Sequence, residues 1–258
     1  GVGLVGSEMC IRDRNINMEK PSLDTAKAGA IRFNTDSSQM EIYDGNQWTG
    51  ILATSPNQQT GGTRAMMLSG AYPVNTDIQI FNIATTGNAT DSGFDFGVTR
   101  YLGGAASDRT RGVYFGGYTP SAQIRYNSIP SVGTTADFGD LSSARFGGTG
   151  VANSTRGISL GGSGPTGGTI NAGMNEIEYV TIQSLGDAVD FGDQGNTEGG
   201  MNCFSSPTRG VMGGAHPSNT PRIEFITIPT TGNSQEFGSL MHDQELSGAA
   251  SNATRGVW

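Results

Sequence analysis

The stretch Asn153–Gly162, which reads NSTRGISLGG, decides how this chain is interpreted, because close copies of it recur along the sequence. Its Thr-Arg-Gly triplet begins at Thr155 and begins again at Thr110, Thr208 and Thr254. A degenerate form, Thr-Arg-Ala, precedes them at Thr63. Consecutive triplets lie 45 to 53 residues apart. Self-similarity at a nearly fixed period indicates a repeat architecture.

Two further markers recur in the same order. The pattern Ile-x-[Ile/Tyr/Phe]-x-x-Ile begins at Ile78, Ile124, Ile177 and Ile223. An acidic residue followed by Phe-Gly begins at Asp95, Asp137, Asp190 and Glu236. Three markers in a fixed order predict four complete repeats and part of a fifth.

Each repeat predicts four short β-strands. Small residues such as those of 149–152 form the first strand, and a turn of Asp, Asn or Ser leads through the triplet, whose glycine is expected to take a positive φ. The second strand, such as 112–115, is closed by a Gly-Gly pair. The Ile-rich third segment alternates at period two, which is typical of a strand, and the fourth strand is expected to end at the Phe-Gly. The predicted fold class is all-β.

Composition excludes several classes of function. The 258 residues contain 15 Lys and Arg against 23 Asp and Glu, a net charge of −8, which argues against binding to nucleic-acid phosphates. No apolar run approaches the roughly 20 residues that cross a bilayer, so membrane insertion is not expected. The two cysteines, Cys10 and Cys203, provide neither a disulfide framework nor a metal-binding Cys-x-x-Cys pair.

The repeats resemble known β-propeller sequences. Repeats of about 40–50 residues with four strands and a Gly-Gly mark are typical of propeller blades. The order of Gly-Gly, an aromatic strand and a later arginine, as at Arg100 and Arg145, resembles the kelch motif. It departs from kelch in having Phe-Gly in place of the usual Trp and in the added triplet turn. The repeats are more similar to kelch-like repeats of predicted structural proteins of marine phages, with matches at 86–91 and 137–141. The resemblance implies a kelch-like β-propeller over 63–258, closed as a small ring or left as an open arc.

The region before the repeats divides into three parts. Residues 1–14 resemble translated sequencing-adapter DNA and are set apart from the fold as an artefact. Residues 15–51 contain a predicted β-hairpin, formed by 29–34 and 40–48 with an Asp-Gly turn, and are similar to a short motif of phage tail-fibre and other virion proteins. Residues 52–62 are predicted to be a linker.

One arginine and one acid recur in each repeat. A bidentate pair between them, within a blade or between neighbouring blades, is the expected brace. A ring of arginines that binds an acidic ligand is the alternative, but a binding site needs particular residues in one place, whereas a brace recurs everywhere. The residues concerned are Arg111, Arg156, Arg209 and Arg255, with Asp95, Asp137, Asp190 and Glu236.

Loops that differ between repeats are the predicted ligand face. The segment between the Gly-Gly pair and the next Ile is eight residues longer at 163–176 than at 118–123. Variable loops on a rigid scaffold are where recognition usually resides. The candidate ligand contacts are Tyr118, Ser163, Thr166, Asn171, Asn175, His216, Asn219 and Arg222.

No catalytic residue, metal ligand or cofactor is expected. The match of 162–167 to Gly-x-Gly-x-x-Gly precedes a β segment, whereas a dinucleotide site needs a helix there. The two histidines, His216 and His242, fall in different repeats.

These expectations, with the resemblance, predict a non-catalytic phage virion protein, a tail fibre or related appendage. Its loops would recognise a host-surface polysaccharide or protein, and its hairpin would contact other virion proteins, with self-association left open. Two alternatives remain. One is a bacterial secreted or surface propeller that binds glycans or proteins, and the other is a fragment of a carbohydrate-active enzyme whose catalytic residues lie elsewhere. The expected location is the virion, or otherwise outside the cell.

Overall fold

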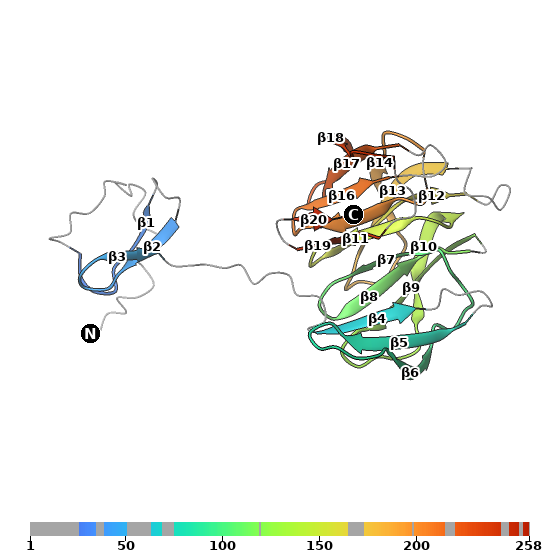
Figure 1. Ribbon diagram of the computed structural model, residues 1–258, viewed down its shortest axis with the longest axis horizontal. Coiled ribbons are helices and arrows are strands. Elements are labelled where there is room, and N and C mark those ends of the chain that lie inside the picture. The colour runs from blue at the N-terminus through green and yellow to red at the C-terminus, as the bar shows by residue number, and fades with distance from the viewer. Residues whose placement is uncertain are drawn as a thin grey trace, which may run out of the picture. The chain divides into compact units, whose positions relative to one another are not determined.

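The computed structural model describes residues 26–34, 39–50, 63–68, 75–118, 120–164, 173–197, 199–214, 220–243, 248–252 and 255–257. These residues form strands, turns and bends without a helix, so the predicted all-β class is confirmed. In this part of the chain there is accordingly no helix long and apolar enough to span a membrane. The chain divides into two compact units, Gly1–Pro56 and Asn57–Trp258 (Figure 1).

The first unit contains a three-stranded antiparallel sheet, one strand more than the expected hairpin. Its strands are β1 (Ile31–Asn34), β2 (Gln39–Tyr43) and β3 (Trp48–Gly50), in that order. The Asp-Gly turn joins β2 to β3, and the Asp44 carboxylate accepts hydrogen bonds from the amides of Asn46 and Gln47, both at 2.8 Å. These backbone hydrogen bonds lower the pKa of Asp44. One face of the sheet is held together by Arg32, which pairs with Glu41 and lies over the Trp48 ring.

The second unit contains antiparallel sheets that follow one another in chain order (Figure 1). Sheet I has three strands: β4 (Arg64–Leu68), β5 (Asp77–Asn82) and β6 (Thr90–Asp95). Sheet II has four: β7 (Gly104–Ser107), β8 (Arg111–Phe115), β9 (Ser121–Ser128) and β10 (Ala136–Arg145). Sheet III has β11 (Thr149–Ala152), β12 (Arg156–Ser163), β13 (Gly173–Thr181) and β14 (Val189–Asp193). Sheet IV has β15 (Asn202–Ser205), β16 (Arg209–Gly213), β17 (Arg222–Thr227) and β18 (Gln235–Ser239). A final pair comprises β19 (Ala250–Ser251) and β20 (Gly256–Val257).

The described residues test the predicted four strands in three of the repeats. Four complete repeats are predicted, but sheets II, III and IV alone show all four strands among the described residues. Sheet I begins with its second strand, because the residues ahead of Thr63 lie outside the described ranges. The first strands of successive repeats contact one another, β7 with β11, β11 with β15 and β15 with β19.

The triplet turns form as predicted around a short polar side chain. The Asp108 carboxylate accepts from the amides of Thr110 (2.7 Å) and Arg111 (2.8 Å) and from the Thr110 hydroxyl (3.1 Å). Asn153 makes the same three contacts in the next repeat. The Ser206 hydroxyl accepts from the backbone amide of Arg209, and the side-chain oxygen of Asn252 accepts from the backbone amide of Arg255. The small polar residue therefore sets the path from the first strand into the second.

We expect Asp108→Ala to destabilise the protein by about 2 kcal/mol, because two backbone amides lose a charged acceptor. Asp108→Asn should cost less than half of that, since Asn153 fills the equivalent position in the next repeat. Burial raises the pKa of Asp108, but hydrogen bonds from Thr110, Gln183 and Arg111 outweigh it and lower the pKa below its ordinary value. The stability from this carboxylate is therefore present at neutral pH and is lost as the pH falls through that lowered pKa. Urea unfolding at pH 7 and at acidic pH checks this: the Asn variant should lose less stability on acidification than the wild type.

The glycine of the triplet has a different role from the one predicted. Gly112, Gly157 and Gly210 are not among the described residues with positive φ. A Cβ at Gly210 would lie 2.7 Å from a methyl of Val151, which belongs to the first strand of the preceding sheet. A Cβ at Gly157 would make only ordinary contacts with Ala106 and Phe115, at 3.4 and 3.5 Å. Close packing against the preceding sheet therefore requires a glycine at Gly210, but not at every triplet.

The fourth strand runs through the Phe-Gly and does not end there. In sheet II, β10 continues to Arg145, with a register shift between Asp137 and Gly139, and Gly139 has φ +151°. Gly192 and Gly238 have φ +144° and +155° at the same place in sheets III and IV. Sheet I departs from this pattern. In sheet II, Asp137 on the fourth strand pairs with Arg125 on the third strand. The counterpart of Arg125 in sheet I is Gln79, which pairs with Asp91 and not with Asp95.

Two hydrophobic cores lie between neighbouring sheets. The first core packs sheet II against Val180 and Ile182 of sheet III. The second core packs sheet III against Met212, Ile226 and Ile228 of sheet IV. Two of the Phe-Gly phenylalanines enter these cores, Phe138 the first and Phe191 the second, and both are no more than 3% exposed. Sheets II and III therefore each bury apolar side chains against the next sheet along the chain.

Candidate functional site

The triplet arginines join neighbouring sheets. The Arg111 guanidinium lies 4.6 Å from the ring centre of Tyr126 in its own sheet and donates to the Ile182 carbonyl of the next sheet at 2.8 Å. Arg156 repeats both contacts, with Tyr179 at 4.6 Å and the Ile228 carbonyl at 2.9 Å.

Two further arginines make part of this contact. Arg209 lies over Phe225 at 4.5 Å, and Arg64 donates to the Ile129 carbonyl at 2.9 Å. The expected brace between neighbours is therefore present, but its acceptor is a backbone carbonyl.

The predicted carboxylate partners do not take part. Among the described residues the ion pairs are Arg32–Glu41, Arg145–Glu178 and Arg222–Glu224, and none joins a triplet arginine to an acid. The register gives the reason. Arg111 pairs with Ser128 at one end of β9, whereas Asp137 lies on the outer strand opposite Arg125. Asp95, Asp137, Asp190 and Glu236 are all exposed, and Arg255 lies in the final turn.

Tyr118, the first predicted ligand contact, belongs to an aromatic cluster. Its ring lies 4.8 Å from that of Tyr101 and 5.4 Å from that of Phe146, between centroids. Its amide donates to the Tyr101 carbonyl at 2.7 Å. Tyr101 and Phe146 follow the fourth strands of sheets I and II. The cluster therefore joins the loop between β8 and β9 to the loops that lead from sheet I to sheet II and from sheet II to sheet III. Tyr118 is half-buried and keeps part of its ring at the surface.

The other predicted contacts are dispersed. Ser163 is fully buried and forms a β-bridge with Phe146. Asn175 lies on β13, where its carbonyl accepts from the amide of Gln194. Arg222 begins β17 and pairs with Glu224 at 2.6 Å. Thr166, Asn171, His216 and Asn219 lie outside the described residues.

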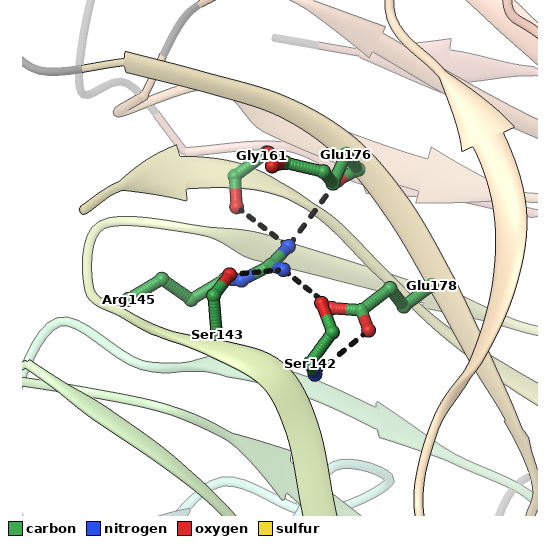
Figure 2. Close-up of polar contacts among 6 residues, drawn as sticks. All are labelled: Ser142, Ser143, Arg145, Gly161, Glu176 and Glu178. Carbon is green, nitrogen blue, oxygen red and sulfur yellow. Dashed lines mark hydrogen bonds and ion pairs between the residues drawn. The ribbon is translucent and has the colours of Figure 1, made fainter.

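A buried ion pair, which the sequence does not single out as a pair, joins sheets II and III (Figure 2). Arg145, at the end of β10 and 1% exposed, pairs with Glu178 of β13. Its guanidinium also donates to the Glu176 carbonyl at 3.2 Å and to the Ser143 hydroxyl at 3.3 Å. The second oxygen of Glu178 accepts from the Ser142 amide at 2.9 Å. Burial lowers the pKa of Arg145, and the charges of Glu178 and Glu176 oppose that change.

The neighbouring junctions carry different charges at the same positions. Between sheets I and II, Arg100 donates to Gln123 at 3.1 Å, and both burial and the charge of Arg125 lower its pKa. Between sheets III and IV, Arg222 stands where sheet III has Glu176, and it supplies the cation for Glu224. A comparison of charges between repeats is the signal that could have located this contact in the sequence.

The first strands line an open hollow of about 590 Å³. Its lining is mostly small side chains of β7, β11 and β15, with Arg64, Met66 and Tyr114 at its margins. Burial raises the pKa of Tyr114, whose hydroxyl bonds Asn127 at 2.9 Å. A second hollow, of about 560 Å³, lies along sheet I between Arg64 and Asn88.

Cys203 lies on β15 at the position that Ala105 and Gly150 occupy on β7 and β11. Its thiol contacts the Gly150 carbonyl at 2.9 Å and the Thr149 hydroxyl at 2.7 Å. Burial raises its pKa to about 11, so the thiol stays protonated at neutral pH.

Within the part of the chain that the structure describes, no three His, Cys, Asp or Glu side chains gather as a metal site. A scan against models of protein families and a search of curated proteins both give no match to this chain.

Proposed function

We propose that residues 63–258 form kelch-like propeller blades. The support is the order of the strands: sheets II, III and IV are antiparallel meanders in chain order, with their first strands adjacent around one cavity. The Gly-Gly pairs fit this role, since Gly116 and Gly161 take positive φ where the second strand ends. Sheets II and III each bury an apolar face against the next sheet, as blades do.

The proposed role is recognition without catalysis. One observation carries it: the contacts between sheets repeat at the triplet-turn end, whereas the loops at the other end differ from repeat to repeat. A brace that is the same in every repeat holds a scaffold, and loops that vary on that scaffold select a ligand. Tyr118 and Tyr101 offer partly exposed rings at this end, and a ring face suits stacking against a sugar.

The proposed setting is a phage virion, as part of a tail fibre or related appendage, with a host-surface polysaccharide as the ligand. This setting rests on the resemblance of the repeats and of the short sheet at 31–50 to virion proteins. The first unit would then contact other virion proteins.

Binding of the full chain to purified lipopolysaccharides and capsular polysaccharides from a panel of marine bacteria tests the proposal. We expect saturable binding to at least one polysaccharide, and Tyr118→Ala should weaken it about tenfold, equivalent to about 1.4 kcal/mol. Phe94→Ser, which changes an exposed aromatic side chain on β6 of sheet I, is the matched control and should bind as the wild type does. Absence of binding across the panel, or equal loss in both variants, would contradict the proposed role.

A further inference from the structure

A leucine with a strained backbone lies beside the Tyr118 cluster. Leu102 has φ +56°, in the left-handed region that a bulky side chain rarely adopts. Its counterparts in the next two repeats are Gly147 and Gly200, since each of the three lies eight residues before the Thr of its triplet. The φ values of these glycines are +66° and +64°. The position therefore needs a left-handed backbone in three successive repeats, and Leu102 alone of the three carries a side chain there.

The contact between successive loops explains the backbone but not the leucine. The Gly147 amide donates to the Leu102 carbonyl at 2.6 Å, and the Gly200 amide donates to the Gly147 carbonyl at 2.8 Å. The same hydrogen bond thus links the loops that precede sheets II, III and IV. A glycine makes this bond without strain, as Gly147 does, because it has no Cβ. The leucine side chain therefore has another reason.

Burial in a core does not supply that reason. Leu102 is 48% exposed and belongs to neither of the two hydrophobic cores. Val132 is the other described non-glycine residue with a positive φ, but its counterparts in sheets III and IV are Leu185 and Thr231, and not glycines. Leu102 is thus the one described position at which a repeat replaces a left-handed glycine by a large apolar residue. Strain of this kind is found where it serves a function.

We propose, on the basis of the proposed function, that Leu102 contacts the bound polysaccharide and selects a sugar that carries a methyl group, namely a 6-deoxyhexose. Leu102 directly follows Tyr101, and its carbonyl bonds the residue after Phe146, so it lies where two of the three loops of the cluster meet. The rings of Tyr101 and Tyr118 are partly exposed at this place. One face of a sugar ring would stack on a tyrosine ring, and the methyl group would lie on the leucine.

The chemistry of the leucine distinguishes a 6-deoxyhexose from the hexose that corresponds to it. A methyl group that packs on Leu102 leaves water favourably, because both surfaces are apolar. A hydroxymethyl group in the same place would lose hydrogen bonds to water, and the leucine side chain offers neither a donor nor an acceptor in return. A single group of this size changes affinity in an apolar site by about tenfold or more.

Three variants of the full chain separate the side chain from the backbone strain. Leu102→Ala removes most of the side chain and keeps the strain, Leu102→Gly removes both, and Leu102→Met keeps a long apolar side chain. The glycine variant should melt roughly 2–4 °C above the alanine variant, because glycine adopts the left-handed backbone freely. A glycine variant that melts no higher than the alanine variant would overturn the proposal, since the leucine would then not be kept at the expense of stability.

Competition for the polysaccharide by free sugars tests the selectivity. L-rhamnose and L-mannose differ only in a methyl against a hydroxymethyl group, as do L-fucose and L-galactose. In one of these pairs the deoxy sugar should inhibit the wild type and Leu102→Met at about tenfold lower concentration than its partner, whereas Leu102→Ala and Leu102→Gly should lose the difference.

Two results would overturn the proposal in different ways. A wild type that binds a polysaccharide through Tyr118 but shows no preference within either pair, or a preference that Leu102→Gly retains, would overturn the role of Leu102 and leave the proposed function standing. A wild type that binds no polysaccharide at all would overturn the proposed function, and the role of Leu102 with it.

Discussion

Gly192→Ala is expected to destabilise the protein by about 3 kcal/mol. The residue has φ +144°, which an alanine adopts only under strain of about 1–3 kcal/mol. Its new methyl group would lie 2.6 Å from the backbone of Gly232, in the turn between β17 and β18. Backbone cannot rotate away as a side chain can, so overpacking adds a further cost of about 1–3 kcal/mol. The melting temperature should fall by roughly 6–12 °C.

Gly238→Ala is the matched control. Gly238 occupies the same place in sheet IV with φ +155°, but no atom lies within 4 Å of the position of a Cβ. This variant should show the backbone strain without the clash, and so about half of the loss. Equal losses in the two variants, measured by thermal unfolding, would contradict the packing between sheets described above.

Glu178→Leu is expected to cost about 3–5 kcal/mol, because it leaves the buried Arg145 cation without its carboxylate. Arg145→Met should cost a similar amount for the converse reason. The double variant Arg145→Met/Glu178→Leu should lose less than either single variant, since an apolar pair leaves no buried charge. Chemical denaturation of the four proteins as a double-mutant cycle measures the coupling.

Arg100→Met provides the comparison within the same chain. Arg100 occupies the position of Arg145 at the preceding junction, but it bonds the neutral Gln123 and the Gly116 carbonyl. No carboxylate is left unpaired when it is removed, so the expected loss is about 1 kcal/mol. A loss as large as that of Arg145→Met would mean that the carbonyl contacts, and not the ion pair, stabilise these junctions.

The strands and their order could be predicted from the sequence, because the same strand and turn patterns recur in successive repeats. The period-two alternation at Ile124 and Ile177 and the short polar residues at Asp108 and Asn153 each correspond to the strand or turn expected. The positive φ was predicted for the triplet glycine, but among the described residues it occurs at the Gly-Gly pairs, as at Gly161.

What depends on the neighbouring sheet could not be predicted in the same way. Spacing alone pairs Arg111 with an acid, but the register of β8 and β9 directs its guanidinium to the Ile182 carbonyl. The need for Gly210 comes from Val151 in another repeat, and not from its own turn. In sheet I, the bulge of β6 has two more residues than the stretch of β5 that it faces, and Asp91, not Asp95, lies opposite Gln79.

The same distinction between local patterns and contacts with other repeats applies to the candidate site. The sequence predicts which loops vary, and so draws attention to Tyr118, but not that Tyr101 and Phe146 from two other loops complete its cluster. Ser163 lies in a variable stretch, yet the bridge to Phe146 buries it. Long-range pairing of this kind leaves no local mark in a single sequence.

The unlike charges at successive junctions have a consequence for how the chain avoids misassembly. Nearly identical repeats invite errors in which one sheet is skipped, or in which sheets are exchanged between chains during synthesis. If sheet II packed directly on sheet IV, Arg145 would be buried beside Arg222 in place of Glu176. The added cation opposes that pairing, whereas the native order places the Glu176 carbonyl and the Glu178 carboxylate around Arg145. The variation in charge between otherwise similar repeats therefore favours the native pairing of neighbouring sheets over non-native pairings.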